Sequence, residues 1–195
     1  TSWHDRYFEL PHAELSVLLR DRLADYKLSV THLHNFLDVT KGGPQYFLLG
    51  NLLRFPSAMS PSGAFGDAMH KVLQDIHVAV IETGKPPALA VATANFERLL
   101  THKHMAKHDF QNYLKRGEKA LQAFYETRTS VLASTQKPEL DFYAQGVVLD
   151  GARLSGKLDL VELRDDGVYV TDYKTGKALG DWSEAKKSAY EKIKQ

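Results

Sequence analysis

The stretch that decides the fold is GKLDLVELRDDGVYVTDYKTG, residues 156–176. Val, Tyr and Thr are frequent in it, and the polar run Arg164-Asp165-Asp166-Gly167 interrupts it, which is typical of a β-hairpin with a turn at Asp166-Gly167. If the whole polar run forms the loop, residue 163 pairs with residue 168 and Asp159 lies directly opposite Asp172. A tighter two-residue turn instead places Asp159 opposite Lys174 and diagonal to Asp172.

Both registers place the carboxylates of Asp159 and Asp172 and the ammonium of Lys174 on one face of the hairpin, because side chains alternate with period two. The rest of that face is apolar and comprises Val161, Leu163, Val168 and Val170. Like charges so close together repel, and they tend to persist only with a cation between them. Oxygen ligands favour magnesium or manganese as that cation. The alternative is a surface ion pair on an edge strand, but the second Asp and the shared face favour a metal site.

At these residues the sequence resembles a known family. Gly-x-Leu-Asp, a turn and then Asp-Tyr-Lys-Thr-Gly resemble the RecB-type branch of the PD-(D/E)XK nucleases. The resemblance implies a metal-dependent nuclease in which Asp159, Asp172 and Lys174 are the catalytic set and the carbonyl of Tyr173 is a further metal ligand. It also implies a mixed α/β fold, with a restriction-endonuclease-like core in which helices flank a small mixed sheet.

The N-terminal half of the chain is expected to be almost wholly helical, because apolar residues recur at helical spacing through most of it. Within residues 29–55, the order Ser-x-Thr-x-x-x-x-Phe-Leu, Gly-Gly-Pro, Phe-Leu-Leu and Leu-Leu-Arg resembles the first segment of nuclease domains fused to the C-terminus of UvrD-like helicases. The resemblance implies helicase motor domains in the same polypeptide and a role in DNA repair or recombination. We expect residues 1–26 to be a linker and an N-terminal helix, and residues 27–195 to be a nuclease domain truncated at its C-terminal end.

A helix is predicted to open at Gly66, after a turn at residues 60–63, and to run to about Glu82. His70 lies beside the apolar stripe of this helix, where a histidine is more often part of the core than a ligand. Gly-x-x-x-His resembles the first motif of the RecB-type family, which implies that His70 is a metal ligand, and Gly66 would let the helix approach the sheet closely. Glu139 occupies the place of an acidic residue in many relatives, although an exposed strand-end Glu is an equal alternative.

Two further helices are predicted at residues 88–103 and 106–134. The segment from Arg98 to Lys119 is rich in basic residues with aromatic residues among them, so it is a candidate for tracking a phosphate backbone. Its candidate DNA-binding residues are Lys103, Lys107, Lys115 and Arg116. The equal alternative is a solvated helix face on which Glu97, Asp109 and Glu118 serve as ion-pair partners.

The composition, 43% hydrophobic and 25% charged over 195 residues, is that of a globular domain with a core. Cys is absent, which excludes a disulfide framework, a thiolate zinc site and the iron–sulfur cluster that some relatives carry. A net charge of +1 leaves DNA affinity to local patches. No segment has the length of a membrane-spanning helix and no secretory signal is visible, so we expect a cytoplasmic protein that makes no membrane contact.

The sequence therefore predicts a Mg²⁺- or Mn²⁺-dependent, exonuclease-like deoxyribonuclease that acts on DNA as a module of a helicase-nuclease. Relatives carry a Gln-x-x-x-Tyr motif on the helix after Asp-x-Lys, but here Lys186 stands four residues before Tyr190. This departure gives weight to the alternative, a non-catalytic module of the same fold that binds DNA or a protein partner. A third hypothesis is a phosphohydrolase that acts on small nucleotides.

Overall fold

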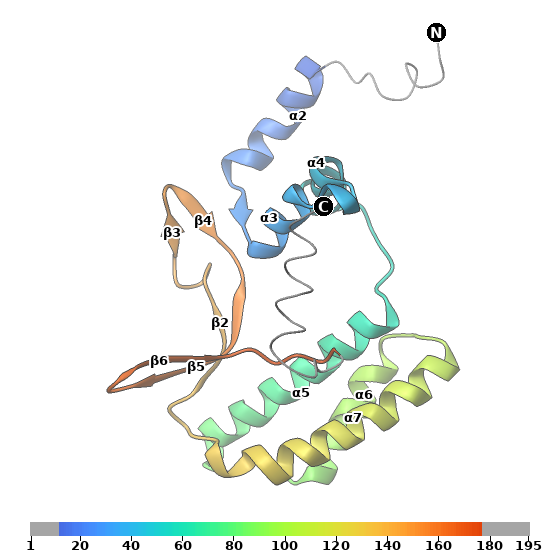
Figure 1. Cartoon of the computed structure of the whole chain (residues 1–195), viewed down its shortest axis with the longest axis vertical. Helices are drawn as coiled ribbons and strands as arrows, with labels where there is room; N and C mark the ends of the chain where they lie inside the picture. Colours follow the sequence, from blue (N-terminus) through green and yellow to red (C-terminus); the bar gives the residue numbers. More distant parts are fainter. Residues whose placement is uncertain (1–11, 177–195) are drawn as a thin grey trace. The chain divides into compact units, whose positions relative to one another are not determined.

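The computed structural model describes residues 12–176 of the chain and confirms the mixed α/β fold that the sequence predicts (Figure 1). Its described part contains six α-helices and two small sheets, divided between two compact units. One unit consists of residues 12–58 and 139–158, and the other of residues 59–138 and 159–176. No helix in this part of the chain is long and apolar enough to cross a membrane.

The first unit combines short helices with a small sheet. Its helices are α2 (His12–Ala24), α3 (Val30–Leu37) and α4 (Gly43–Tyr46), with a 3-10 turn η1 (Val39–Lys41) before α4 and a π-helical segment η2 (Phe47–Leu52) after it. Its strands are β1 (Lys27–Leu28), β3 (Val148–Leu149) and β4 (Ala152–Leu154), in the order β1-β4-β3. Strand β1 is parallel to β4, whereas β3 is antiparallel to it.

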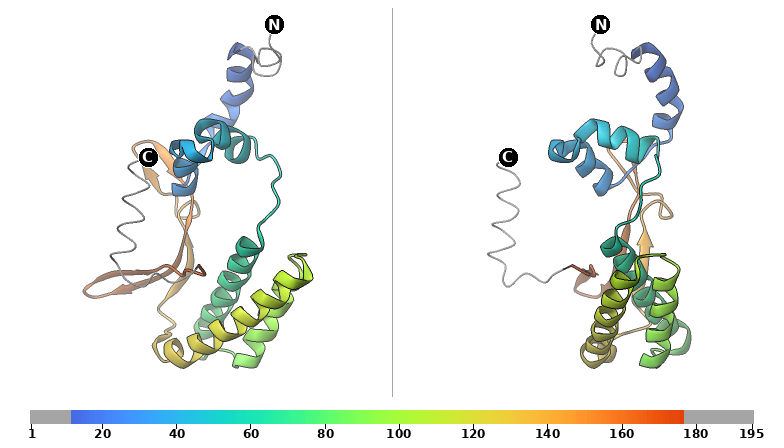
Figure 2. Two further views of the ribbon diagram at one scale, coloured as in Figure 1. Left: turned by 45° about the vertical axis from the view of Figure 1, so that its right-hand side comes forward. Right: turned by 90° about the vertical axis from the view of Figure 1, so that its right-hand side faces the viewer.

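Three long helices form the core of the second unit. They are α5 (Pro61–Thr83), α6 (Leu89–Thr101) and α7 (Lys107–Arg128), which lie side by side in every view (Figure 2), and a 3-10 turn η3 (Thr129–Val131) follows them. The apolar core cluster that they share consists of Phe65, Ala68, Met69, Val72, Leu73, Ile76, Ala92, Phe96, Leu100 and Leu121. Removal of this apolar surface from water is what holds α5 against the other two helices.

Helix α5 begins at Pro61, five residues before the predicted start at Gly66. The Oγ of Ser60 accepts the backbone N–H of Gly63, and Pro61 takes the first helical position, where its missing N–H is no loss. The prediction of a turn at residues 60–63 is therefore wrong, because these residues form the capped N-terminus of the helix. At the other end, Gly84 closes the helix in the left-handed conformation, with φ of 75°.

The second sheet has the strand order β2-β5-β6. Its strands are β2 (Lys137–Asp141), β5 (Lys157–Arg164) and β6 (Gly167–Thr171), and both β2 and β5 contain residues of the two units. The predicted pairing of residue 163 with residue 168 is confirmed, and the register with Asp159 opposite Lys174 is wrong. The turn itself is Asp165-Asp166, not Asp166-Gly167, because Gly167 already pairs with Arg164 as the first residue of β6.

Helices α6 and α7 approach closely at Gly117. A Cβ atom there would lie 2.1 Å from Cε1 of Phe96, whose ring is fully buried. We expect Gly117→Ala to lower the free energy of unfolding by about 1–3 kcal/mol, because overpacking a filled core outweighs the gain in helix propensity. Chemical denaturation measures the change. Gly50→Ala is the control, since a Cβ there meets no atom nearer than 4.0 Å. A Gly117→Ala variant as stable as wild type would contradict the close packing.

Candidate metal centre

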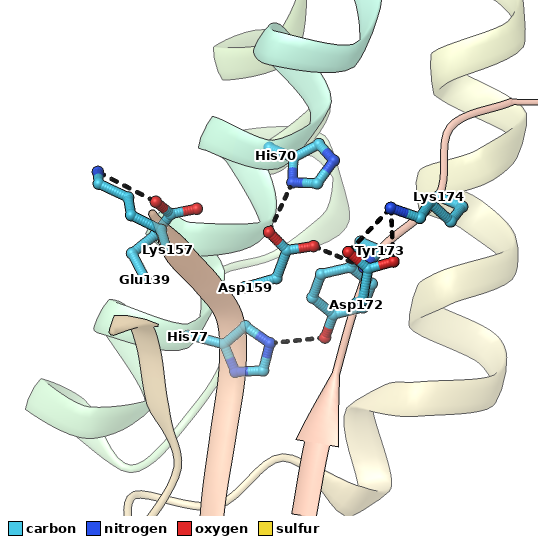
Figure 3. A network of polar contacts seen from close by, with 8 residues as sticks. All are labelled: His70, His77, Glu139, Lys157, Asp159, Asp172, Tyr173 and Lys174. Carbon is cyan, nitrogen blue, oxygen red and sulfur yellow. Dashed lines mark hydrogen bonds and ion pairs between the residues drawn. The ribbon is translucent and has the colours of Figure 1, made fainter. Parts of the chain in front are cut away.

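Asp159 lies on β5, at the end of the hairpin that is opposite the turn. One carboxylate oxygen, Oδ2, accepts the backbone N–H of Tyr173 at 2.6 Å, and the other, Oδ1, lies 3.2 Å from Nδ1 of His70 (Figure 3). The last paired residues of the ladder are Leu160 and Thr171, so in that register Asp159 and Asp172 are the next opposed positions. The Asp159 side chain is only 14% exposed, and its orientation is set by groups from both the hairpin and α5.

His70 reaches Asp159 from the edge of the apolar stripe of α5. The stripe itself is buried, whereas the imidazole of His70 is 31% exposed, so solvent and a ligand can both reach it. One helical turn earlier, a Cβ atom on Gly66 would lie 3.2 Å from Oγ1 of Thr175. The helix thus approaches the segment after β6 closely at Gly66, whereas the sequence predicts a close approach to the sheet itself.

Asp172 and Lys174 form an ion pair with each other, with Nζ 2.7 Å from Oδ2, on the segment that follows β6. Their side chains are 57% and 80% exposed. The ligand atoms of His70, Asp159 and Asp172 do not all lie within 4.8 Å of one another. The structure therefore brings His70 and Asp159 together, while Asp172 keeps the contact with Lys174 that the ion-pair alternative describes.

Glu139 belongs to the first unit, and its predicted accessory role stays a prediction. Within that unit, the Glu139 carboxylate lies 3.2 Å from Nζ of Lys157 (Figure 3). Its backbone has φ of 53°, a left-handed conformation that a residue without the freedom of glycine rarely adopts inside a strand. Such strain is most often found at functional sites, but it does not assign a function by itself.

The candidate DNA-binding residues differ in how tightly they are held. Lys103 pairs with Asp67 instead of the expected acidic residues of its own segment. The Arg116 guanidinium donates a hydrogen bond to the carbonyl oxygen of Thr175, and it lies 5.0 Å from the centre of the Phe65 ring. Arg116 therefore connects α7 to the segment that carries Lys174, and both residues line a cavity of about 220 Å³.

His77 is a polar residue of this region that the sequence analysis did not single out. It lies on α5, seven residues after His70, and its Nε2 is 2.9 Å from the hydroxyl oxygen of Tyr173. Burial lowers the pKa of the His77 imidazole, and the Gln136 side chain opposes that shift to a lesser degree. Burial likewise raises the pKa of the Tyr173 hydroxyl, which thus keeps its proton. The only sequence signal for His77 was its spacing from His70, about two helical turns.

A family model for the PD-(D/E)XK nuclease superfamily matches residues 27–193, which is most of the chain. The chain belongs to the PD-(D/E)XK nuclease superfamily. The predicted superfamily is thereby confirmed, and its members are generally metal-dependent nucleases. Searches of curated proteins and of solved structures found no match. The letters D-X-K of the superfamily name match Asp172-Tyr173-Lys174, whereas Leu158, not a proline, precedes Asp159.

The donor atoms at the end of the hairpin fit the divalent metal that PD-(D/E)XK nucleases use. An imidazole nitrogen and a carboxylate oxygen lie 3.2 Å apart on two separate elements, as ligands of one ion do. The second carboxylate oxygen is held by a backbone N–H, and such an outer contact fixes the direction in which a ligand points.

We expect Asp159→Ala to abolish Mn²⁺ binding, because it removes an anionic donor, and His70→Ala to weaken binding less, because water replaces a neutral ligand more easily. Isothermal titration calorimetry with Mn²⁺ measures both affinities. Asp75→Ala is the control, since Asp75 is a partly exposed carboxylate of the same helix, where it pairs with Lys71 and accepts a hydrogen bond from the Asn95 amide. Unchanged Mn²⁺ affinity in Asp159→Ala would place the metal elsewhere.

Proposed function

We propose that this chain is a Mg²⁺- or Mn²⁺-dependent deoxyribonuclease that hydrolyses phosphodiester bonds. The observation that carries the proposal is the pairing of His70 with Asp159 at 3.2 Å, beside an Asp-x-Lys triplet, in a chain of the PD-(D/E)XK superfamily. Asp159, Asp172, His70 and the carbonyl of Tyr173 are the proposed ligands. The metal, when bound, neutralises charge on the phosphate and activates the attacking water.

Lys174 is the proposed catalytic cation. Its ammonium lies beside the carboxylate of Asp172, so its charge is adjacent to a proposed metal ligand. From there, Nζ can donate a hydrogen bond to the attacking water or to a phosphate oxygen, and it stabilises the negative charge that develops in the transition state.

The cavity beside Lys174 supports a nucleic-acid substrate. Its lining combines the two cations Arg116 and Lys174 with the aromatic rings of Phe65, Phe124 and Tyr173. The two cations suit a phosphate-bearing substrate, because they attract its negative charge.

The finer assignment that we propose is an exonuclease-like module of the RecB type, joined in cis to helicase motor domains and acting in DNA repair or recombination. Its support is the motif order within residues 29–55 and the Asp-Tyr-Lys-Thr-Gly motif, as given above. Glu139 is proposed as an accessory acidic residue of this module.

A non-catalytic DNA- or partner-binding module is the second candidate. The observation that favours it is the Asp172–Lys174 ion pair, in which the carboxylate contacts the lysine and does not join His70 and Asp159. The Lys186 that stands four residues before Tyr190, where relatives carry Gln, points in the same direction; both residues lie outside the described part of the chain.

Cleavage of labelled DNA with Mg²⁺, compared with release of phosphate from mononucleotides, separates these candidates. We expect wild type to cleave DNA, and Lys174→Ala to retain Mn²⁺ binding but to lose about 100- to 1,000-fold in rate, because a donor to the transition state is gone. Lys71→Ala, which removes an exposed lysine of α5, is the matched control and should keep full activity. A wild-type protein that binds Mn²⁺ and DNA without cleavage would establish the binding module instead.

Charge reversal at Lys103, Lys107, Lys115 and Arg116 tests the DNA surface. If these residues contact phosphates, the slope of log affinity against log salt should become shallower by about 0.7–0.9 per lost contact. Fluorescence anisotropy with labelled DNA at several salt concentrations measures the slope. The control reverses four exposed basic residues elsewhere, Arg20, Arg22, Lys85 and Lys137. Equal slopes in the two variants would identify the helix face as merely solvated.

A further inference from the structure

A buried polar contact lies in the second unit, close to the proposed metal ligands. His77 is 2% exposed, and its Nε2 lies 2.9 Å from the hydroxyl oxygen of Tyr173 (Figure 3). The Tyr173 ring packs against the apolar core and makes an edge contact with Phe124. A hydrogen bond that is shielded from water in this way holds its partners in one geometry.

Tyr173 is thereby fixed at two points. Its side-chain hydroxyl contacts His77, and its backbone N–H donates to the carboxylate of Asp159 at 2.6 Å. The other oxygen of that carboxylate contacts His70, which lies on the same helix as His77 and about two turns before it. The contacts therefore connect His77 to Tyr173, Tyr173 to Asp159, and Asp159 to His70, so that they begin and end on α5.

The segment after β6 needs such an anchor, because the paired ladder stops at Thr171. Beyond that residue, the two Tyr173 contacts and the hydrogen bond from Arg116 to the carbonyl of Thr175 hold the chain. Arg116 lies on the exposed side of this segment, whereas His77 lies in the core. His77 is thus the anchor that solvent and salt screen least.

We propose that His77 is a positioning residue of the metal centre: through the Tyr173 hydroxyl it fixes the segment whose N–H orients the Asp159 carboxylate. The proposal rests on the function proposed above. The simpler alternative is that the His77–Tyr173 contact only stabilises the core.

The second ring nitrogen of His77 argues against that alternative. Nδ1 is buried and makes no hydrogen bond of good geometry among the described residues, although the Gln136 side chain is near enough to raise the pKa of the imidazole. An unsatisfied buried polar atom destabilises the folded state, so an apolar side chain would fill this place at lower cost if packing were its only purpose. A histidine at this place is thus better explained by the contact that Nε2 makes with Tyr173 than by packing alone.

Three variants and a control test the proposal in the 195-residue chain. His77→Leu removes both nitrogens, Tyr173→Phe removes only the hydroxyl, and His77→Gln keeps an amide that can reach the hydroxyl. The control is Tyr125→Phe, which deletes a comparable tyrosine hydroxyl of the same unit, one that donates to the carbonyl of Pro87 at 2.8 Å. Each protein is studied at a temperature where denaturation curves show it to be folded.

The first readout is the affinity for Mn²⁺ by electron paramagnetic resonance. We expect His77→Leu and Tyr173→Phe to weaken binding by about 10- to 100-fold, the range found when an outer contact of a metal ligand is lost. His77→Gln should recover most of the affinity, and Tyr125→Phe should bind as wild type does. Tyr173→Phe keeps the test valid if His77→Leu does not fold.

The second readout needs no metal. The amide proton of Tyr173 donates a short hydrogen bond to a carboxylate, so its NMR signal should lie downfield, and His77→Leu should move it upfield and speed its hydrogen exchange. If His77→Leu and Tyr173→Phe lose thermal stability but keep both the Mn²⁺ affinity and this signal, the proposal is overturned. If wild type binds no Mn²⁺ and the signal still responds to His77→Leu, the positioning of Asp159 holds while the proposed metal function fails.

Discussion

The hydrogen bond from the Tyr173 backbone N–H to the Asp159 carboxylate is the interaction on which the rest of the site depends. It occurs where the β5–β6 ladder ends. There the Asp159 side chain, instead of a neighbouring strand, accepts the backbone N–H of the segment that follows β6. A bond between a backbone donor and an ionised acceptor is among the stronger kinds in proteins. With His70 on the other oxygen, both oxygens of this largely buried carboxylate have a polar partner, so the side chain presents a fixed face to a cation.

Helix α5 can support this carboxylate only because the rest of the unit holds the helix in place. The close contact of Gly117 with the Phe96 ring lets α6 and α7 form a tight pair, and the apolar stripe of α5 packs on them. The same helix carries His70 at the edge of that stripe and His77 within it. A helix that packs on the core along one side therefore also places two imidazoles at the end of the hairpin.

The parts of the site that could be predicted follow from backbone periodicity. Alternation along the hairpin placed Asp159, Asp172 and Lys174 on one face in either register, and the observed ladder makes Asp159 and Asp172 the next opposed positions. The turn was misplaced because Asp-Gly usually marks a turn, whereas Gly167 takes its positive φ of 157° at the first position of β6. His77 could not be found, because a histidine within an apolar stripe looks like a core residue until Tyr173, far along the chain, is placed beside it.

Backbone periodicity also does not determine which partner an exposed side chain contacts. Asp172 is the residue of the site for which this matters most. Its ion pair with Lys174 lies in solvent, where such pairs contribute about 0–1 kcal/mol. A doubly charged cation held by His70 and Asp159 would attract the same carboxylate more strongly than one screened ammonium does. The ion pair is therefore weak evidence against a metal centre, and the ligand that must be fixed in advance is Asp159. An exposed Asp172 beside an Asp159 carboxylate that two polar groups hold in place fits a site that is completed when the metal binds.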